Sequence, residues 1–266
     1  MGIAKSTYYY ELKRIDKVEV RNQELMEEIR KIFTRNKGRY GVRRVHRELT
    51  NCGWQVNHKR VQRLMSTMGL AGKRPKEKYR SFKGEVGTTA PNVIDRDFST
   101  TAPLQKWTTD VSQFSMSWGK CYFSPILDMN TNEVISYDLS QSPNMEQIKR
   151  MLDGAFSKFP SVEGLVFHSD QGWQYRHEYF RNRLKSNGVV QSMSRKGNCY
   201  DNSIMETFFG RMKTEMFYGS EKEFTSFETF SKAVDDYINY YNNERIQAET
   251  KWMPPVKFRE ASIAPS

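Results

Sequence analysis

The chain has 266 residues, 37% of them hydrophobic and 13% aromatic, so it can build a packed core in one large domain or two small ones. It shows no stretch of roughly 18 apolar residues, no signal-peptide pattern, and only three widely separated cysteines, so we expect a cytoplasmic protein without a disulfide framework. The net charge of +11 is unevenly placed: residues 1–90 carry 22 Lys and Arg against 9 Asp and Glu, whereas the remainder carries 20 against 22.

Residues 1–70 are predicted to form a small all-helical domain. Apolar residues recur at helical spacing from Glu19 to about Thr34, and two shorter helices are predicted at 40–49 and 57–70. Asn57 is the expected N-cap of the last helix, and Gly69 is its expected end. The two short helices resemble a helix-turn-helix, a motif that places its second helix in the major groove of DNA.

Basic side chains in this domain are candidates for DNA contact. The second short helix would carry Lys59, Arg60 and Arg63 on its exposed side, and the first carries Arg43 and Arg44. The alternative is that these charges are merely solvated on the surface of a helical bundle.

Residues 71–102 are predicted to be a basic linker, because they lack apolar periodicity and contain several Gly and Pro residues. Lys73, Arg74 and Lys76 are the first of its basic residues. Such a segment can lie along a phosphate backbone, where each cationic contact releases counterions. It can equally be a simple tether.

Residues 103–220 predict a mixed five-stranded sheet with flanking helices. Three antiparallel strands at 106–116, 120–130 and 133–140 are followed by alternating helices and strands. These are a helix at 144–159, a strand at 164–170, a helix at 177–188, a strand at 189–193 and a helix that begins near Asp201 or Ser203. This order is that of the ribonuclease H architecture. A long helix at 224–249 and a tail are expected to pack on this core as a C-terminal region, 221–266.

Three acids stand out in the core. Asp110 lies within the first strand pattern, Asp170 closes the fourth strand, and Glu206 lies in the first turn of the later helix. If the first and fourth strands are neighbours, all three can converge at one end of the sheet, where ligand sites gather. Each also has a structural explanation: an edge-strand charge, a turn residue, and a capping box of Ser203 with Glu206.

The combined motifs decide between these explanations. "TTDVSQF", "HSDQG" and "DNSIMETFF" occur in this order, and 35 residues separate Asp170 from Glu206. With "GIAKSTYYY", "YGVRRVHREL" and "YINYYNNERIQ", they make the chain resemble, nearly end to end, the second-frame (OrfB) product of insertion-sequence-3-type DDE transposases, whose catalytic core resembles that of retroviral integrases.

The resemblance implies that Asp110, Asp170 and Glu206 are the catalytic residues and the ligands of two Mg²⁺ or Mn²⁺ ions. It also implies cleavage of double-stranded DNA at the ends of an insertion sequence and transfer of the strand to a target. Lys213, two helical turns after Glu206, is expected to contact DNA phosphate near the ions. The DNA-contacting residues expected in total are Arg43, Arg44, Lys59, Arg60, Arg63, Lys73, Arg74, Lys76, Asn202 and Lys213.

Partners follow from the same resemblance. We expect a homo-oligomer on DNA, a first-frame (OrfA-like) segment as fusion or partner, no membrane, and a bacterial cytoplasm in which the bound protein associates with the nucleoid. Two alternatives stay open: a non-catalytic DNA-binding regulator that needs the first-frame segment, and a ribonuclease H-like nuclease that cleaves without joining.

Overall fold

The structure is a computed structural model that describes residues 5–73, 89–195 and 199–264. The chain divides into two compact units, Met1–Arg74 and Pro75–Ser266. Within the described ranges, no helix combines the length and apolar character that crossing a bilayer requires.

The N-terminal unit contains three helices, α1 (Lys5–Arg35), α2 (Val42–Asn51) and α3 (His58–Thr67). They pack around a small apolar core, in which one buried stripe comes from each helix: Leu25, Ile29, Ile32, Val45, Leu49, Val61, Leu64 and Met65. The Asn57 side chain accepts a hydrogen bond from the Lys59 amide, so the predicted N-cap of α3 is confirmed. Helix α1 begins 14 residues before the predicted start at Glu19.

The second unit is built on a mixed sheet. Its strands are β1 (Lys106–Thr109), β2 (Ser112–Met116), β3 (Gly119–Asp128), β4 (Val134–Ser140), β5 (Val166–Ser169) and β6 (Val190–Met193). Strand β3 pairs antiparallel with β1, β2 and β4, whereas β1, β5 and β6 pair parallel. The predicted mixed α/β architecture is therefore confirmed.

The strand count differs from the predicted five, because the strand expected at 106–116 is divided into β1 and β2. The two halves pair with β3 in one continuous register, in which Thr109 lies opposite Ile126 and Ser112 opposite Phe123. In that register, Asp110 falls opposite Pro125, which has no N–H to donate to the ladder. The Thr109 hydroxyl instead donates to the Pro125 carbonyl at 2.8 Å. The described sheet thus has six strands, and the interruption lies at Asp110.

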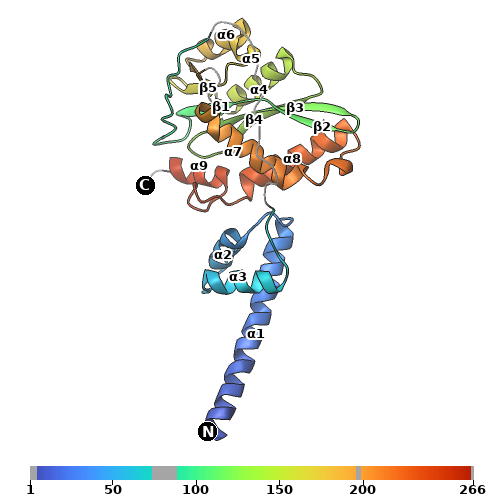
Figure 1. The fold of residues 1–266 in the computed structure, drawn as a ribbon. Coiled ribbons are helices and arrows are strands. Elements are labelled where there is room, and N and C mark those ends of the chain that lie inside the picture. The colour runs from blue at the N-terminus through green and yellow to red at the C-terminus, as the bar shows by residue number, and fades with distance from the viewer. Residues whose placement is uncertain (1–4, 74–88, 196–198, 265–266) are drawn as a thin grey trace. The chain divides into compact units, whose positions relative to one another are not determined.

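Helices cover both faces of this sheet (Figure 1). On one face lie α4 (Met145–Lys158), the short α5 (Trp173–Arg176) and α6 (Glu178–Ser186), packed on a core that includes Trp107 and Phe167. On the other lie α7 (Ser203–Met212), which continues as a π-helical turn (Lys213–Phe217), and α8 (Phe227–Asn243). Aromatic contacts such as Phe123 with Phe208 join this second layer to the sheet.

The C-terminal region contains two helices rather than one long helix. Helix α8 ends at Asn243, where the Asn242 side chain bonds both the amide and the carbonyl of Val134 in β4. A turn then leads to α9 (Pro255–Ile263). These contacts confirm that the region packs on the core.

The last part of the predicted linker is also packed on the core. Met193 donates its amide to the Pro91 carbonyl, and the Val93 amide donates to the Ser192 hydroxyl. Ile94 is buried. Residues 90–94 of the predicted linker, which ends at 102, therefore lie along β6 and pack on the core.

Candidate active site

Asp110 and Asp170 leave neighbouring strands side by side. Strands β1 and β5 pair parallel with Trp107 beside Phe167 and Thr108 beside His168, and each aspartate follows two residues after the last of these pairs. The condition for convergence of the acids, that the first and fourth predicted strands are neighbours, is therefore met. Because side chains alternate along a strand, both aspartates continue the face that carries Thr108 and His168. That face is covered by α7.

Glu206 approaches from α7. A buried stripe of Met205, Phe208, Phe209 and Met212 fixes this helix against the sheet and leaves Glu206 half-buried. Asn202, not Ser203, is the N-cap, and no side-chain bond caps the helix. The capping box of Ser203 with Glu206 is therefore absent, and the glutamate has no role in the cap.

Electrostatics join the three acids. Burial raises the pKa of Asp110 well above its usual range, and the negative charges of Asp170 and Glu206 raise it further. Burial also raises the pKa of Asp170, although the Gly172 amide, which donates to its Oδ1 at 2.8 Å, opposes the shift. Burial raises the pKa of Glu206. The three carboxyl groups thus share one region, in which the charges of Asp170 and Glu206 penalise the ionised form of Asp110.

The acids do not form a closed ligand cluster by themselves. Among the described residues, no three His, Cys, Asp or Glu side chains are gathered tightly enough to hold a metal. The donor set nevertheless fits a divalent cation, because carboxylate oxygens are the ligands that Mg²⁺ and Mn²⁺ prefer. A cation between Asp110 and Asp170 would also remove the repulsion that raises the pKa of Asp110.

Lys213 lies at the edge of this region and is buried. Its Nζ donates to the Gln113 carbonyl at 3.1 Å and stands 5.0 Å from the centre of the Phe114 ring. Burial lowers its pKa to about 8, and the charge of Asp110 opposes that shift. The ammonium is therefore bonded to β2, and the phosphate contact predicted for it stays a prediction.

Asn202 is also buried, at 7% exposure, and its Oδ1 accepts a hydrogen bond from the Thr108 hydroxyl at 3.1 Å. The side chain is thus enclosed between α7 and β1, and its predicted contact with DNA stays a prediction. Local sequence pattern does not indicate this bond, which joins residues 94 positions apart.

The basic candidates of the N-terminal unit differ in exposure. Arg43, Lys59, Arg63 and Lys73 are exposed. Arg44 is half-buried, with its guanidinium 5.4 Å from the centre of the Tyr40 ring. The exposed position predicted for Arg60 is wrong: its guanidinium is half-buried and donates to the Asn22 Oδ1 of α1 at 2.7 and 3.1 Å. Arg74 and Lys76 lie outside the described residues.

Three further residues near the acids were not predicted. His168 is buried, and its Nδ1 and Nε2 contact the Ser192 hydroxyl at 2.9 Å and the Asp201 carbonyl at 2.9 Å. Trp173, three residues after Asp170, is exposed at 47%, whereas Tyr175 of the same short helix is fully buried. The local sequence pattern does not predict that the Trp173 indole is exposed to solvent.

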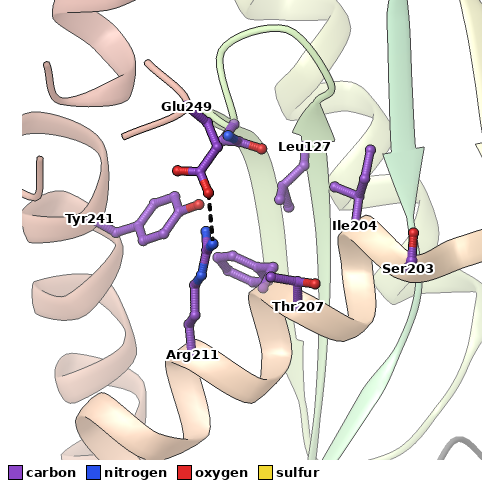
Figure 2. A pocket seen from close by; sticks show the side chains of 9 residues that line it. Leu127, Ser203, Ile204, Thr207, Arg211, Tyr241 and Glu249 are labelled. Carbon is purple, nitrogen blue, oxygen red and sulfur yellow. Dashed lines mark hydrogen bonds and ion pairs between the residues drawn. The ribbon is translucent and has the colours of Figure 1, made fainter. Parts of the chain in front are cut away.

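A separate pocket lies along another side of α7 (Figure 2). Ser203, Thr207 and Arg211 line it at successive helical turns, and Arg211 pairs with Glu249 of the tail at 3.3 Å. Its volume is ≈ 180 Å³, and none of the three acids lines it. This pocket is therefore distinct from the acidic site.

Comparison with known families agrees with this arrangement. An HTH-like domain matches residues 20–78, and integrase core domains match residues 100–199 and 206–263. The chain is 47% identical to InsK of insertion sequence element IS150 from Escherichia coli K12, a protein named as a transposase, over 99% of this chain and 92% of InsK. The chain belongs to the insertion-sequence transposase family.

Two further similarities concern a relative and a fold. A transposase-like protein of Haemophilus influenzae Rd is 51% identical to this transposase family member, over 79% of the chain and 95% of the relative. A chain of the simian T-cell lymphotropic virus intasome, solved with a regulatory subunit of PP2A, has a TM-score of 0.55, covers 89% of this chain and 76% of its own, and is 11% identical. The latter shows a common fold with an integration complex. The ribonuclease H-like, integrase-type fold predicted from the sequence is thus confirmed.

Proposed function

We propose that this transposase cleaves DNA at the ends of an insertion sequence and joins the freed 3′ end to target DNA, with Asp110, Asp170 and Glu206 as a divalent-metal site. The observation that carries the proposal is the parallel register of β1 and β5, which sets two aspartates side by side beneath α7. Family membership supports the class of reaction, and the convergence of the three acids supports this end of the sheet as the place where the reaction occurs.

Each acid has a distinct position in the proposed reaction. The charges of both other acids act on Asp110, so these three side chains are the ones that would together hold divalent cations. Two bound Mg²⁺ or Mn²⁺ ions would stabilise charge on the attacking and leaving oxygens of a phosphodiester. The Gly172 amide orients the Asp170 carboxylate by a direct hydrogen bond. Lys213 lends positive charge near Asp110 without leaving its bond to Gln113.

DNA affinity is proposed to come from the basic N-terminal unit and the segment that follows it. Exposed Arg43, Lys59 and Arg63 offer charges to phosphates, and α3 is the helix for a major groove. Near the acids, the exposed indole of Trp173 offers a surface on which a DNA base can stack. The proposed partners are double-stranded DNA, further copies of this chain and a first-frame segment.

The deciding experiment is metal-dependent cleavage and joining on the DNA that flanks the coding region, with wild type and Glu206→Gln compared, with and without the first-frame segment. The substitution removes a proposed metal ligand, so it should abolish both reactions. Because Glu206 takes no part in the helix cap, folding and metal-free DNA affinity should stay nearly unchanged. Cleavage without joining would favour a nuclease. Binding without chemistry under every condition would favour a regulator.

A further inference from the structure

The two residues that precede α7 are bonded to the strands that carry the aspartates. The Thr108 hydroxyl donates to the Asn202 Oδ1 at 3.1 Å, and His168 Nε2 contacts the Asp201 carbonyl at 2.9 Å. Thr108 lies two residues before Asp110, and His168 lies two residues before Asp170. The start of α7 is therefore attached to both strands at matching positions, because Thr108 and His168 are themselves register partners.

The Asp201 carboxylate fixes the same turn from the other side. It accepts bonds from Arg195 (Nε to Oδ2, 3.0 Å, and Nη2 to Oδ1, 3.1 Å) and from the Arg195 amide at 3.0 Å. Arg96 Nε donates at 2.9 Å, and Asn92 Nδ2 at 3.2 Å. The Asp201 side chain is 1% exposed, and the charges of the two guanidiniums stabilise its ionised form. Asp201 is thus bonded both to Arg195, just after β6, and to the segment at 92–96.

Glu206 lies four residues after this anchored pair, about one helical turn. Residues i and i+4 belong to one hydrogen-bonded turn, so a shift of Asn202 is expected to shift Glu206 as well. The buried stripe of α7 holds the helix against the sheet, and the more directional hydrogen bonds fix its start. The polar bonds at Asp201 and Asn202 are therefore what can set the position of the Glu206 carboxylate.

We propose that Asp201 and Asn202 are positioning residues, which through His168 and Thr108 place Glu206 relative to Asp110 and Asp170 and so determine how tightly the three acids hold a divalent cation. This inference rests on the proposed function. It adds that Asp201 and Asn202 act on the metal site without touching the metal.

The test compares two substitutions of one residue in the full chain. Thr108→Val keeps the shape of the side chain and removes the donor to Asn202, whereas Thr108→Ser keeps the donor. Mn²⁺ binding without DNA is measured by electron paramagnetic resonance titration, and the rise of Tm with added Mg²⁺ is measured beside it. Thr108→Val should weaken Mn²⁺ binding by about 10- to 100-fold, as is typical when a residue that orients a metal ligand is changed. It should also remove most of the Mg²⁺-dependent rise of Tm. Thr108→Ser should retain both the Mn²⁺ affinity and the rise of Tm.

A matched control separates positioning from stability. Thr131→Val also removes a buried hydroxyl donor, to Asp128 Oδ1 at 3.1 Å, but Asp128 is the register partner of Trp107, which lies on the opposite face of β1 from Thr108. This variant should lose stability and keep wild-type Mn²⁺ affinity. If Thr108→Val loses stability alone and binds Mn²⁺ as wild type does, the positioning role is overturned.

Asp201→Asn provides a second variant, because it retains the size of the side chain and weakens the bonds to Arg195 and Arg96. It should weaken Mn²⁺ binding in the folded protein while DNA affinity without metal stays unchanged. Wild-type affinity in Asp201→Asn would likewise overturn the inference and leave the proposed function standing. Absence of Mn²⁺ binding and cleavage in wild type would instead overturn the proposed function itself.

Discussion

Arg245 and Glu215 form an ion pair at 2.7 Å that is almost completely removed from solvent, with side-chain exposures of 1% and 6%. The pair joins the end of α8 to the π-helical turn that follows α7, and Tyr237 donates a further bond to Glu215 at 3.2 Å. It thus fastens the C-terminal region to the helix that carries Glu206. The "NNERIQ" sequence therefore has a structural task that its charged residues did not suggest.

Replacing Arg245 with Met should destabilise the protein by about 3–5 kcal/mol, because the Glu215 carboxylate would stay buried without its partner. The double variant Arg245→Met with Glu215→Leu should recover most of that loss, since no buried charge remains. The free energy of unfolding, measured by denaturant titration, distinguishes these cases. A double variant as unstable as the single one would show that the pair itself, not the orphaned charge, supplies the stability.

Gly172→Ala should slow DNA cleavage by about 10- to 100-fold, because small displacements at a reacting centre cost that much. An added Cβ would stand 2.9 Å from Asp170 Oδ1 and 2.6 Å from Gln174 Nε2, so the carboxylate must move. The backbone at Gly172, with φ −55° and ψ 146°, is open to any residue, so folding should be little affected.

Gly210→Ala is the control for this substitution. Gly210 lies in the same helix as Glu206, and no described atom outside its own helical backbone comes within 4 Å of a Cβ added there. Alanine should stabilise the helix by up to about 1 kcal/mol and leave the cleavage rate unchanged. Equal rate losses in both variants would mean that the Gly172 effect is not a displacement of Asp170.

Lys59→Ala with Arg63→Ala should weaken DNA binding and reduce the dependence of log affinity on log salt by about two, one for each lost phosphate contact. Anisotropy titrations between about 50 and 200 mM salt measure this slope. Arg60→Ala should leave the slope unchanged and instead destabilise the helical unit, because its guanidinium bonds Asn22. A slope change for Arg60→Ala alone would place that residue at the DNA.

The contribution of Asp201 to stability should depend on pH. Its bonds to Arg195 and Arg96 hold the pKa of the folded carboxyl below the unfolded value of about 3.9. The stabilisation is therefore complete above about pH 4 to 5 and is lost as the pH falls through the folded pKa. The difference in unfolding free energy between wild type and Asp201→Asn should be about 2–3 kcal/mol near neutral pH. It should shrink in acid, and a difference that is constant down to pH 2 would contradict this account.

Most of the fold could be predicted because it is encoded locally. Alternating strand residues and helical stripes placed β3, β4, α4 and α6 within a few residues of their observed bounds. The break between β1 and β2 was missed because it depends on Pro125, a residue of the neighbouring strand. The local sequence pattern indicates the side-chain alternation of one strand. Hydrogen bonding between two strands also depends on the backbone N–H donors of the neighbouring strand.

The intramolecular partners of several predicted DNA-contacting residues were missed for a related reason. Arg60, Asn202 and Lys213 all appeared available as polar side chains, yet they bond Asn22, Thr108 and Gln113 respectively. Whether a charged side chain faces solvent or a partner is set by residues far away in sequence. Composition alone predicted the basic character of the N-terminal part, but not which of its charges are exposed.

The sequence by itself determined the three acids, their order and the alternation of elements, since these follow from motif and period. Only the tertiary structure decided that Asp110 and Asp170 stand side by side. The parallel pairing of β1 with β5 brings them together, although β2, β3, β4 and α4 lie between them in the sequence. It also decided that Asp201 and Asn202 face inward. Burial makes an unpaired polar group costly, so the contacts that satisfy it fix where the neighbouring Glu206 can stand.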